Sequence, residues 1–284
     1  METDLGYADL NIPVARTSDA GLRSLIKRAL ELGYQTVALN TVVDQENLMT
    51  KKKKQKAGEL NKLSEFPEPT IVELNPEDYP HLHSRGLKPK ILTRLTIMIS
   101  DNDFLIHYNK SEIVKNYDLL AIIPKTAQCL ISLLKSSFRF DILSYTPDLI
   151  YSGVKWQRKL YNECIEKFIH FELMYVPAIV DREDRRKTIG LSHSYQSIGK
   201  SKKIFFSSSA TKPIELRSPS DVSNLAFIFG MNENQGKDAV KKHCLDIYKA
   251  ALGRKLGVYR VRVEKIQGEP VEESGSDSDG METD

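Results

Sequence analysis

Three consecutive serines, Ser207, Ser208 and Ser209, directly follow the strand-like run 203–206 and suggest chemistry of two kinds. A serine hydroxyl acts as a nucleophile when a base activates it, or it hydrogen-bonds a phosphate group. A catalytic serine is not favoured, because the GxSxG setting of a nucleophile elbow is missing and no histidine lies close in the sequence. Phosphate contacts by the three hydroxyls and an ordinary turn without a ligand remain open alternatives.

His81 and His83 lie two positions apart, a spacing that barrel metallohydrolases use for metal ligands. Here the pair follows a proline-interrupted segment, and the first strand-like run, 7–13, carries Asp9 and Asn11 in place of histidines. A hydrolytic metal site needs further ligands and an open position, and the other histidines are dispersed along the chain. We therefore expect no metal on this chain. The alternative is a free-standing metal-dependent barrel phosphoesterase that uses His81, His83 and Asp9.

Cationic side chains offer a third kind of chemistry, the binding of nucleic-acid phosphates. For any single cation, a solvated charge or a local salt bridge is the better interpretation, but together they exceed what solubility requires. The sequence has no RRM signature or zinc finger, so recognition of the shape and backbone of a folded RNA is favoured over base-specific recognition. The candidate RNA-binding residues are Arg94, Lys125, Arg185, Arg186, Lys203, Lys212, Arg217, Arg260 and Arg262.

The distribution of charge supports a polyanionic partner. Lys and Arg outnumber Asp and Glu by 41 to 38, but residues 268–284 hold seven of the acids and no Lys or Arg. This leaves 41 basic against 31 acidic residues, or +10, on residues 1–267. A region with so large a positive net charge attracts polyanions. The acidic segment has too little apolar surface to order itself, and we predict that it is disordered.

A block of four lysines, Lys51, Lys52, Lys53 and Lys54, is a candidate nuclear-targeting signal. Phosphate contact and a solvated, mobile loop are the other interpretations. The first residues lack the basic and apolar zones of a signal peptide, and no apolar run approaches the length of a membrane helix. The three cysteines are scattered without a CxxC pair, which favours a reducing compartment, the cytosol or the nucleus.

The elements that must position these residues alternate between strand-like and helical patterns, which is typical of parallel crossover connections. No GxGxxG follows the first strand-like run, which disfavours a dinucleotide-binding sheet. We predict an α/β fold, an irregular TIM-like barrel of one domain over residues 1–267, with 44–89 as an excursion loop and 268–284 as a disordered tail. The expected strands are 7–13, 36–43, 90–100, 117–124, 140–145, 168–179 and 203–206, and the expected helices include 18–32, a region around 130–134, and 188–198.

The segment 207–217 is predicted to be a loop that joins a strand to a helix. Ser218 is a capping residue, Pro219 suits the first helical turn, and Asp221 suits the third helical position. A helix is therefore expected to begin here and to close at Gly230. In a TIM-like barrel the loops that follow the strands carry the function, and the last ones often hold phosphate.

Several stretches together resemble a known family, the thirty-kilodalton protein subunit of ribonuclease P and ribonuclease MRP. The resemblance extends from about residue 5 to about residue 250, and its last block is the most specific. The stretches are "YADLN" (7–11), "LGYQTVALN" (32–40), "KILTRLTIMISD" (90–101), "FELMYVPAIVD" (171–181) and "SSSATKPIELRSPSDVSNLAFIFGM" (207–231).

The resemblance implies a TIM-like barrel related to metal-dependent phosphoesterases but without their metal site. It implies a non-catalytic role in the nucleus and nucleolus, in tRNA and rRNA processing. The RNA of the particle, with magnesium, removes the 5′ leader from precursor tRNA, while the protein braces the RNA and pairs with a small RRM-like subunit and other subunits. The chain itself is then expected to bind no cofactor and to contact ribonuclease P RNA and MRP RNA, but no membrane.

Carried over by position, the resemblance implies that Arg94, Lys125, Lys212 and Arg217 are cations that contact RNA or set the scaffold. The sequence also departs from the family pattern. The lysine-rich block and the segment 60–89 are expected to be lineage-specific, and the region 150–168 lacks a proline-containing stretch associated with the family.

Overall fold

The computed structural model describes residues 5–15, 17–50, 66–100, 111–149 and 154–257. Within them, parallel strands form a single sheet in which each strand is hydrogen-bonded to the next one along the chain. The strands are β1 (Ala8–Pro13), β2 (Thr36–Asp44), β3 (Lys90–Ile99), β4 (Leu119–Pro124), β5 (Ile142–Leu143), β6 (His170–Met174) and β7 (Ile204–Ser207).

The sheet curls until its first and last strands meet. The backbone N–H of Ser209, just after β7, donates to the carbonyl oxygen of Asn11 in β1 at 2.9 Å. The hydroxyl of Ser208 donates to the same oxygen at 3.3 Å. The result is a nearly closed, irregular barrel, as the alternation of the sequence predicts.

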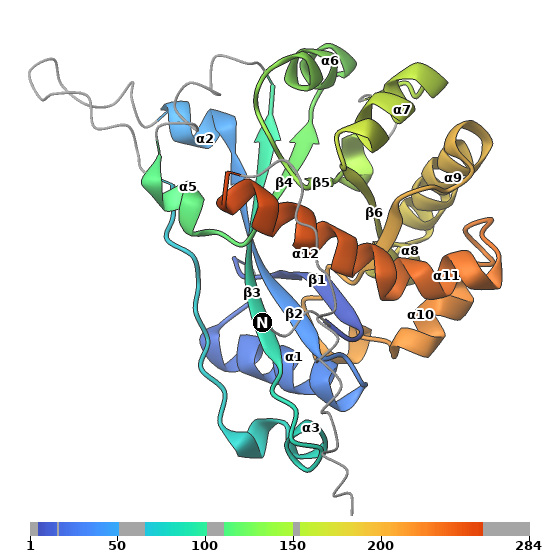
Figure 1. Cartoon of the computed structure of the whole chain (residues 1–284). Helices are drawn as coiled ribbons and strands as arrows, with labels where there is room; N and C mark the ends of the chain where they lie inside the picture. The colour runs from blue at the N-terminus through green and yellow to red at the C-terminus, as the bar shows by residue number, and fades with distance from the viewer. Residues whose placement is uncertain (1–4, 16, 51–65, 101–110, 150–153, 258–284) are drawn as a thin grey trace, which may run out of the picture.

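Helices surround the strands (Figure 1). The α-helices are α1 (Asp19–Glu31), α2 (Gln45–Thr50), α3 (Pro80–His83), α5 (Glu112–Asn116), α6 (Ala127–Lys135), α7 (Arg158–Glu166), α8 (Tyr175–Val180), α9 (Arg182–Gly199), α10 (Pro219–Leu225), α11 (Glu233–Val240) and α12 (Lys242–Lys255). Short 3-10 turns are η2 (Pro76–Asp78), η3 (Pro147–Leu149) and η4 (Pro213–Glu215). None of these described helices is long and apolar enough to cross a membrane.

The first helix shows why the local signals work. The hydroxyl of Ser18 accepts a hydrogen bond from the N–H of Gly21 at 3.3 Å, which caps α1. Leu22, Leu25, Ile26, Ala29 and Leu30 are buried at helical spacing. Gly33 follows the helix with φ = 102°, a conformation that other residues rarely adopt. The predicted helix 18–32 is confirmed.

Four predicted elements differ in the structure. The strand expected over 140–145 is reduced to Ile142–Leu143, and the helix expected to close at Gly230 ends at Leu225, because residues 226–230 continue as turns. The strand expected over 168–179 ends at Met174, because the chain turns directly into α8. The helix expected at 188–198 begins earlier, since the carboxylate of Asp181 accepts from the backbone N–H groups of Glu183 and Asp184 at 2.8 and 2.9 Å.

Helix α12 lies across the amino ends of the strands and closes that end of the barrel (Figure 1). Its Cys244, Ile247 and Ala251 pack against apolar residues inside the barrel. At its last turn, Arg254 forms an ion pair of 2.9 Å with Asp141, and Lys255 one of 2.8 Å with Asp118.

Candidate functional site

The interior of the barrel contains a buried ion pair between β3 and β6. The guanidinium of Arg94 donates from Nη1 to Oε1 of Glu172 at 2.7 Å and from Nη2 to Oε2 at 2.6 Å. Both side chains are completely buried. Arg94 also donates to the carbonyl oxygen of Leu10 at 2.9 Å and to the hydroxyl of Thr96 at 3.1 Å. This bidentate geometry is the strong form of an arginine–carboxylate contact.

Polar side chains from other strands extend this pair into a network. The hydroxyl of Thr96 donates to Oδ1 of Asn40 at 2.7 Å, and the Asn40 amide donates to Oδ1 of Asn11 at 2.8 Å. Asn11 and Ser207 in turn donate to Oε1 of Glu172, at 3.0 and 2.6 Å. The network therefore links β1, β2, β3, β6 and β7 around the centre of the barrel, and its members satisfy one another.

Two buried carboxyl groups have opposite pKa shifts. Burial alone would raise the pKa of Glu172, but the charge and hydrogen bonds of Arg94, with hydroxyl donors, hold it below its usual value. Burial raises the pKa of Asp9 to about 6 against hydrogen bonds from the Ser208 and Asn11 backbone, and the charge of Glu172 adds to the rise. Oδ2 of Asp9 has no hydrogen-bond partner among the described residues.

These positions correct three predicted RNA contacts. Arg94, Ser207 and Ser208 have no exposed surface to offer, since they are 0%, 1% and 0% accessible. Arg94 serves the scaffold instead, and the two serines hold β7 to β1 and β6. Ser209 is half-buried with φ = 57°, and its phosphate contact stays a prediction.

Lys125 lies at the carboxyl end of β4, but its charge is already balanced. Its Nζ is 3.1 Å from both carboxylate oxygens of Asp44 and 2.7 Å from Oε1 of Glu46. A phosphate would have to compete with these two carboxylates, which makes Lys125 a weak candidate for RNA contact.

Four further predicted cations also lie at the carboxyl end. The Arg217 guanidinium donates to the carbonyl oxygens of residues 214 and 216 at 2.8 and 2.9 Å. That of Arg185 donates to the last carbonyls of α8, at 2.6 and 2.8 Å. These bonds orient both groups but leave their charge in place. Lys212 and Arg186 are exposed, and neither forms an ion pair within the described part of the chain.

Lys203 lies elsewhere, directly before β7, and forms an ion pair of 3.5 Å with Asp246 of α12. It borders a cavity at the amino ends of the strands, whose walls also include Arg139, Lys167 and Lys249. Arg139, Lys167 and Lys249 are not among the cations predicted from the sequence. Arg139 and Lys167 each come three residues before a strand, β5 and β6, whereas Lys249 lies on α12 and has no such signal.

The residues of the alternative metal site do not come together. His81 and His83 are exposed on the short helix α3, whereas Asp9 is buried in β1. In the described ranges, no group of three or more His, Cys, Asp or Glu side chains could hold a metal ion. The residues Arg260, Arg262, Lys51, Lys52, Lys53 and Lys54 and the acidic tail lie outside the described residues, so their predicted roles stay predictions.

Comparisons with known proteins match most of the chain. A sequence profile for RNase P subunit p30 matches residues 6–256. The chain is 34% identical over 252 residues to the Ribonuclease P protein subunit p30 of Mus musculus, covering 85% of this chain and 84% of the mouse protein. It is 27% identical to the Probable ribonuclease P protein subunit 3 of Schizosaccharomyces pombe, covering 85% and 92% of the two chains.

Among solved structures, a chain from the cryo-EM structure of archaeal Ribonuclease P with mature tRNA has a similar fold. The TM-score is 0.58 at 15% sequence identity, covering 92% of this chain and 99% of the archaeal one. At that identity the likeness shows the shared fold alone.

Proposed function

We propose that this chain, which belongs to the RNase P subunit p30 family, is a protein subunit of ribonuclease P that binds and stabilises the RNA of the particle. The observation that supports this most is the extent of the match, since relatives that carry the subunit's name align with 85% of this chain. In the particle, the subunit takes part in removing the 5′ leader from precursor tRNA.

The role we propose is non-catalytic. Inside the barrel, Arg94 is paired with Glu172, and Asn40 is hydrogen-bonded to Thr96 and Asn11, so these polar groups support the scaffold. Cleavage then belongs to the RNA and its magnesium ions, and this chain binds no cofactor of its own. The metal-dependent phosphoesterase is disfavoured because His81, His83 and Asp9 are apart.

RNA binding is proposed to be electrostatic and centred on the carboxyl end of the barrel. Lys212 and Arg186 supply exposed charge there, while Arg217 and Arg185 supply guanidinium groups that backbone carbonyls hold in place. Each phosphate neutralised releases counterions, so affinity falls steeply as salt rises. Backbone contacts of this kind position an RNA without reading its bases.

The partners proposed are ribonuclease P RNA, precursor tRNA in the assembled particle, a small RRM-like subunit and other protein subunits. We also propose that the chain serves ribonuclease MRP, and with it rRNA processing. Its location is the nucleus, including the nucleolus, and Lys51 to Lys54 are the candidate targeting signal.

The direct test is to purify the tagged chain from cells and to sequence the RNA that accompanies it. Enrichment of ribonuclease P RNA is expected, and enrichment of MRP RNA as well if the subunit is shared. Nuclease treatment before capture distinguishes an RNA-binding subunit from a pure protein adaptor. The protein partners of an adaptor would still be captured after the treatment. A chain that brings down neither RNA is not the subunit proposed.

A further inference from the structure

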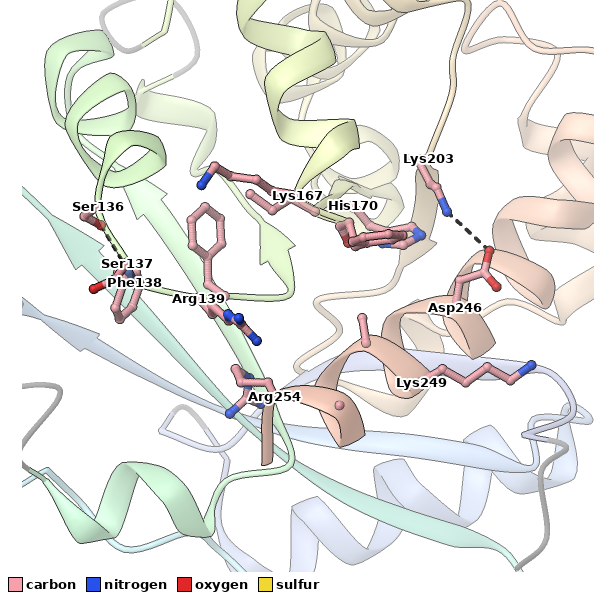
Figure 2. Close-up of a pocket in the computed structure, with 15 residues that line it drawn as sticks. Ser136, Ser137, Phe138, Arg139, Lys167, His170, Lys203, Asp246, Lys249 and Arg254 are labelled. Carbon is pink, nitrogen blue, oxygen red and sulfur yellow. Dashed lines mark hydrogen bonds and ion pairs between the residues drawn. The ribbon is translucent and has the colours of Figure 1, made fainter. Parts of the chain in front are cut away.

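A cavity of about 490 Å³ opens at the amino end of the barrel, opposite the proposed RNA surface (Figure 2). The loops that precede β5, β6 and β7 form one side of it, and α12 forms the other. A volume in this range is typical of sites for small molecules. The proposed function makes no use of this end of the molecule.

The walls of the cavity are strongly cationic. Five basic side chains line it against one carboxylate, that of Asp246, and a second carboxylate, Asp141, lies behind Arg254. Positive charge therefore exceeds negative charge by three. Concave surfaces lined with one sign of charge concentrate ligands of the opposite sign. The basic residues are Arg139, Lys167, Lys203, Lys249 and Arg254.

Only part of this charge has a structural role. Arg254 pairs with Asp141 and fastens α12, and Lys203 pairs with Asp246 at 3.5 Å. Lys167 and Lys249, by contrast, form no ion pair with any described residue. Their charges are available to a ligand, and removing them should leave the fold intact.

His170, at the start of β6, is a buried wall residue with one unpartnered nitrogen. Its Nδ1 lies 3.1 Å from the carbonyl oxygen of Phe168, which can only accept, so Nδ1 carries the proton. Burial, with the charges of Lys203 and His243, holds the pKa of His170 well below its usual value, so the ring is neutral. Nε2 is then an acceptor, and it has no partner among the described residues.

The remaining wall is mainly apolar, with Phe138, Phe140 and Ile169, and also includes Ser136 and Ser137. Two non-glycine residues at the rim, Phe168 and Lys203, have left-handed backbone conformations with φ of 62° and 61°. Non-glycine residues rarely adopt such conformations, which persist where the surroundings impose them, often at ligand sites.

We propose that this cavity binds a nucleotide, with the phosphate among the cationic side chains and a ribose hydroxyl donating to His170. An anion alone would satisfy the charge but not the unpartnered acceptor or the apolar wall. A nucleotide combines an anion, hydroxyl donors and a planar base. A free nucleotide and a nucleotide of an RNA strand present the same groups, and the experiment below distinguishes these two sources.

The test measures binding of adenosine 5′-monophosphate, adenosine and inorganic phosphate to the full chain by calorimetry. Adenosine 5′-monophosphate should bind more tightly than either fragment. Lys167→Ala/Lys249→Ala should weaken its binding about tenfold or more, as expected for the loss of charge-assisted hydrogen bonds. The matched control, Lys27→Ala/Lys159→Ala, removes two exposed helical lysines outside the cavity and should change nothing.

Two further measurements locate the site. His170→Phe keeps a ring of similar size, and should weaken the nucleotide more than inorganic phosphate. Amide chemical shifts on titration with adenosine 5′-monophosphate should change at residues 136–140, 167–170 and 203 and along α12. A short oligoadenylate that binds more tightly than the mononucleotide identifies an RNA strand as the source; equal affinity identifies a free nucleotide.

The proposal is overturned if the wild type does not bind adenosine 5′-monophosphate at millimolar concentrations. It is also overturned if inorganic phosphate binds as tightly as the nucleotide, if the lysine variant and its control behave alike, or if the shifts lie away from the cavity. None of these outcomes bears on whether ribonuclease P RNA accompanies the chain.

Discussion

The guanidinium of Arg94 and the carboxylate of Glu172 meet through two hydrogen bonds of 2.7 and 2.6 Å, although the residues are 78 positions apart in the chain. The pair joins β3 to β6 across the middle of the barrel, with neither side chain exposed. A cation that the sequence places among RNA contacts is thus part of the scaffold. If mutation of Arg94 weakens RNA binding, we therefore expect the cause to be the lower stability of the fold and not the loss of a direct contact.

Replacing Arg94 alone should be strongly destabilising. Arg94→Met leaves Glu172 as an unpaired buried charge, which costs about 3–5 kcal/mol of unfolding free energy. Adding Glu172→Gln removes that charge, and the double variant should recover a large part of the loss. Denaturant unfolding measures both, and Lys212→Met serves as the exposed control with a change near zero.

The same two variants show whether Arg94 supports the fold or contacts the RNA directly. RNA affinity should recover together with stability in Arg94→Met/Glu172→Gln. If the double variant folds stably but binds RNA as weakly as Arg94→Met does, Arg94 acts on the RNA directly and its assignment to the scaffold is wrong.

The buried Asp9 should make stability fall as pH rises from about 4 to about 6. Its pKa is raised from 3.8 to about 6 in the folded chain, so the folded state retains a proton that the unfolded state has released. At about 1.4 kcal/mol per pKa unit, this contribution amounts to roughly 3 kcal/mol. It is fully present below pH 4 and lost above the folded pKa.

Asp9→Asn isolates this effect. The difference in unfolding free energy between the variant and the wild type should move in the variant's favour as pH rises through this window. Unfolding curves at several pH values measure it, with Asp19→Asn on the exposed start of α1 as the control. A difference that does not vary with pH would contradict the assignment of a raised pKa to Asp9.

The exposed cations at the carboxyl end should account for part of the salt dependence of RNA binding. Arg186→Ala/Lys212→Ala should weaken binding to ribonuclease P RNA and make the log–log salt slope shallower by roughly 0.7–0.9 per lost contact. Lys125→Ala should have a smaller effect, because Asp44 and Glu46 already neutralise Lys125. Unchanged slopes would mean that the RNA binds another face.

Removing the acidic residues 268–284 should strengthen RNA binding at low salt. The net charge of the chain rises from +3 to +10 when its seven acids are lost. Electrostatic attraction to a polyanion then increases, and the difference should disappear at high salt. A variant in which the seven acids become Asn or Gln controls for length. Equal affinities of all three chains at low salt would contradict the prediction.

The order of helices and strands could be predicted from the sequence, because the residues that mark each element lie within or next to it. Caps such as Ser18 and Ser218 mark where helices begin, and buried parallel strands such as β4 appear as continuous apolar runs. The site was less accessible. A strand buried on both faces gives no pattern that tells the barrel interior from the helix side, so the face of Arg94 could not be assigned.

The partners of a buried cation are likewise hidden in the sequence. Glu172 lies in the stretch "FELM", where nothing marks it as the partner of a residue in β3. The strand predicted over 168–179 failed for a related reason. Apolar residues such as Val176 and Ala178 are buried equally well in the short helix α8, and periodicity cannot separate the two over so few residues.

The central claim is that this barrel supports an RNA catalyst without cleaving RNA itself. Its most direct test measures release of the 5′ leader from precursor tRNA, in magnesium, by three samples. These are the purified chain freed of nucleic acid, the particle assembled without the chain, and the particle with it. The account predicts no cleavage by the chain alone and activity that rises when the chain completes the particle. Repeated turnover of precursor tRNA by the isolated chain would contradict it.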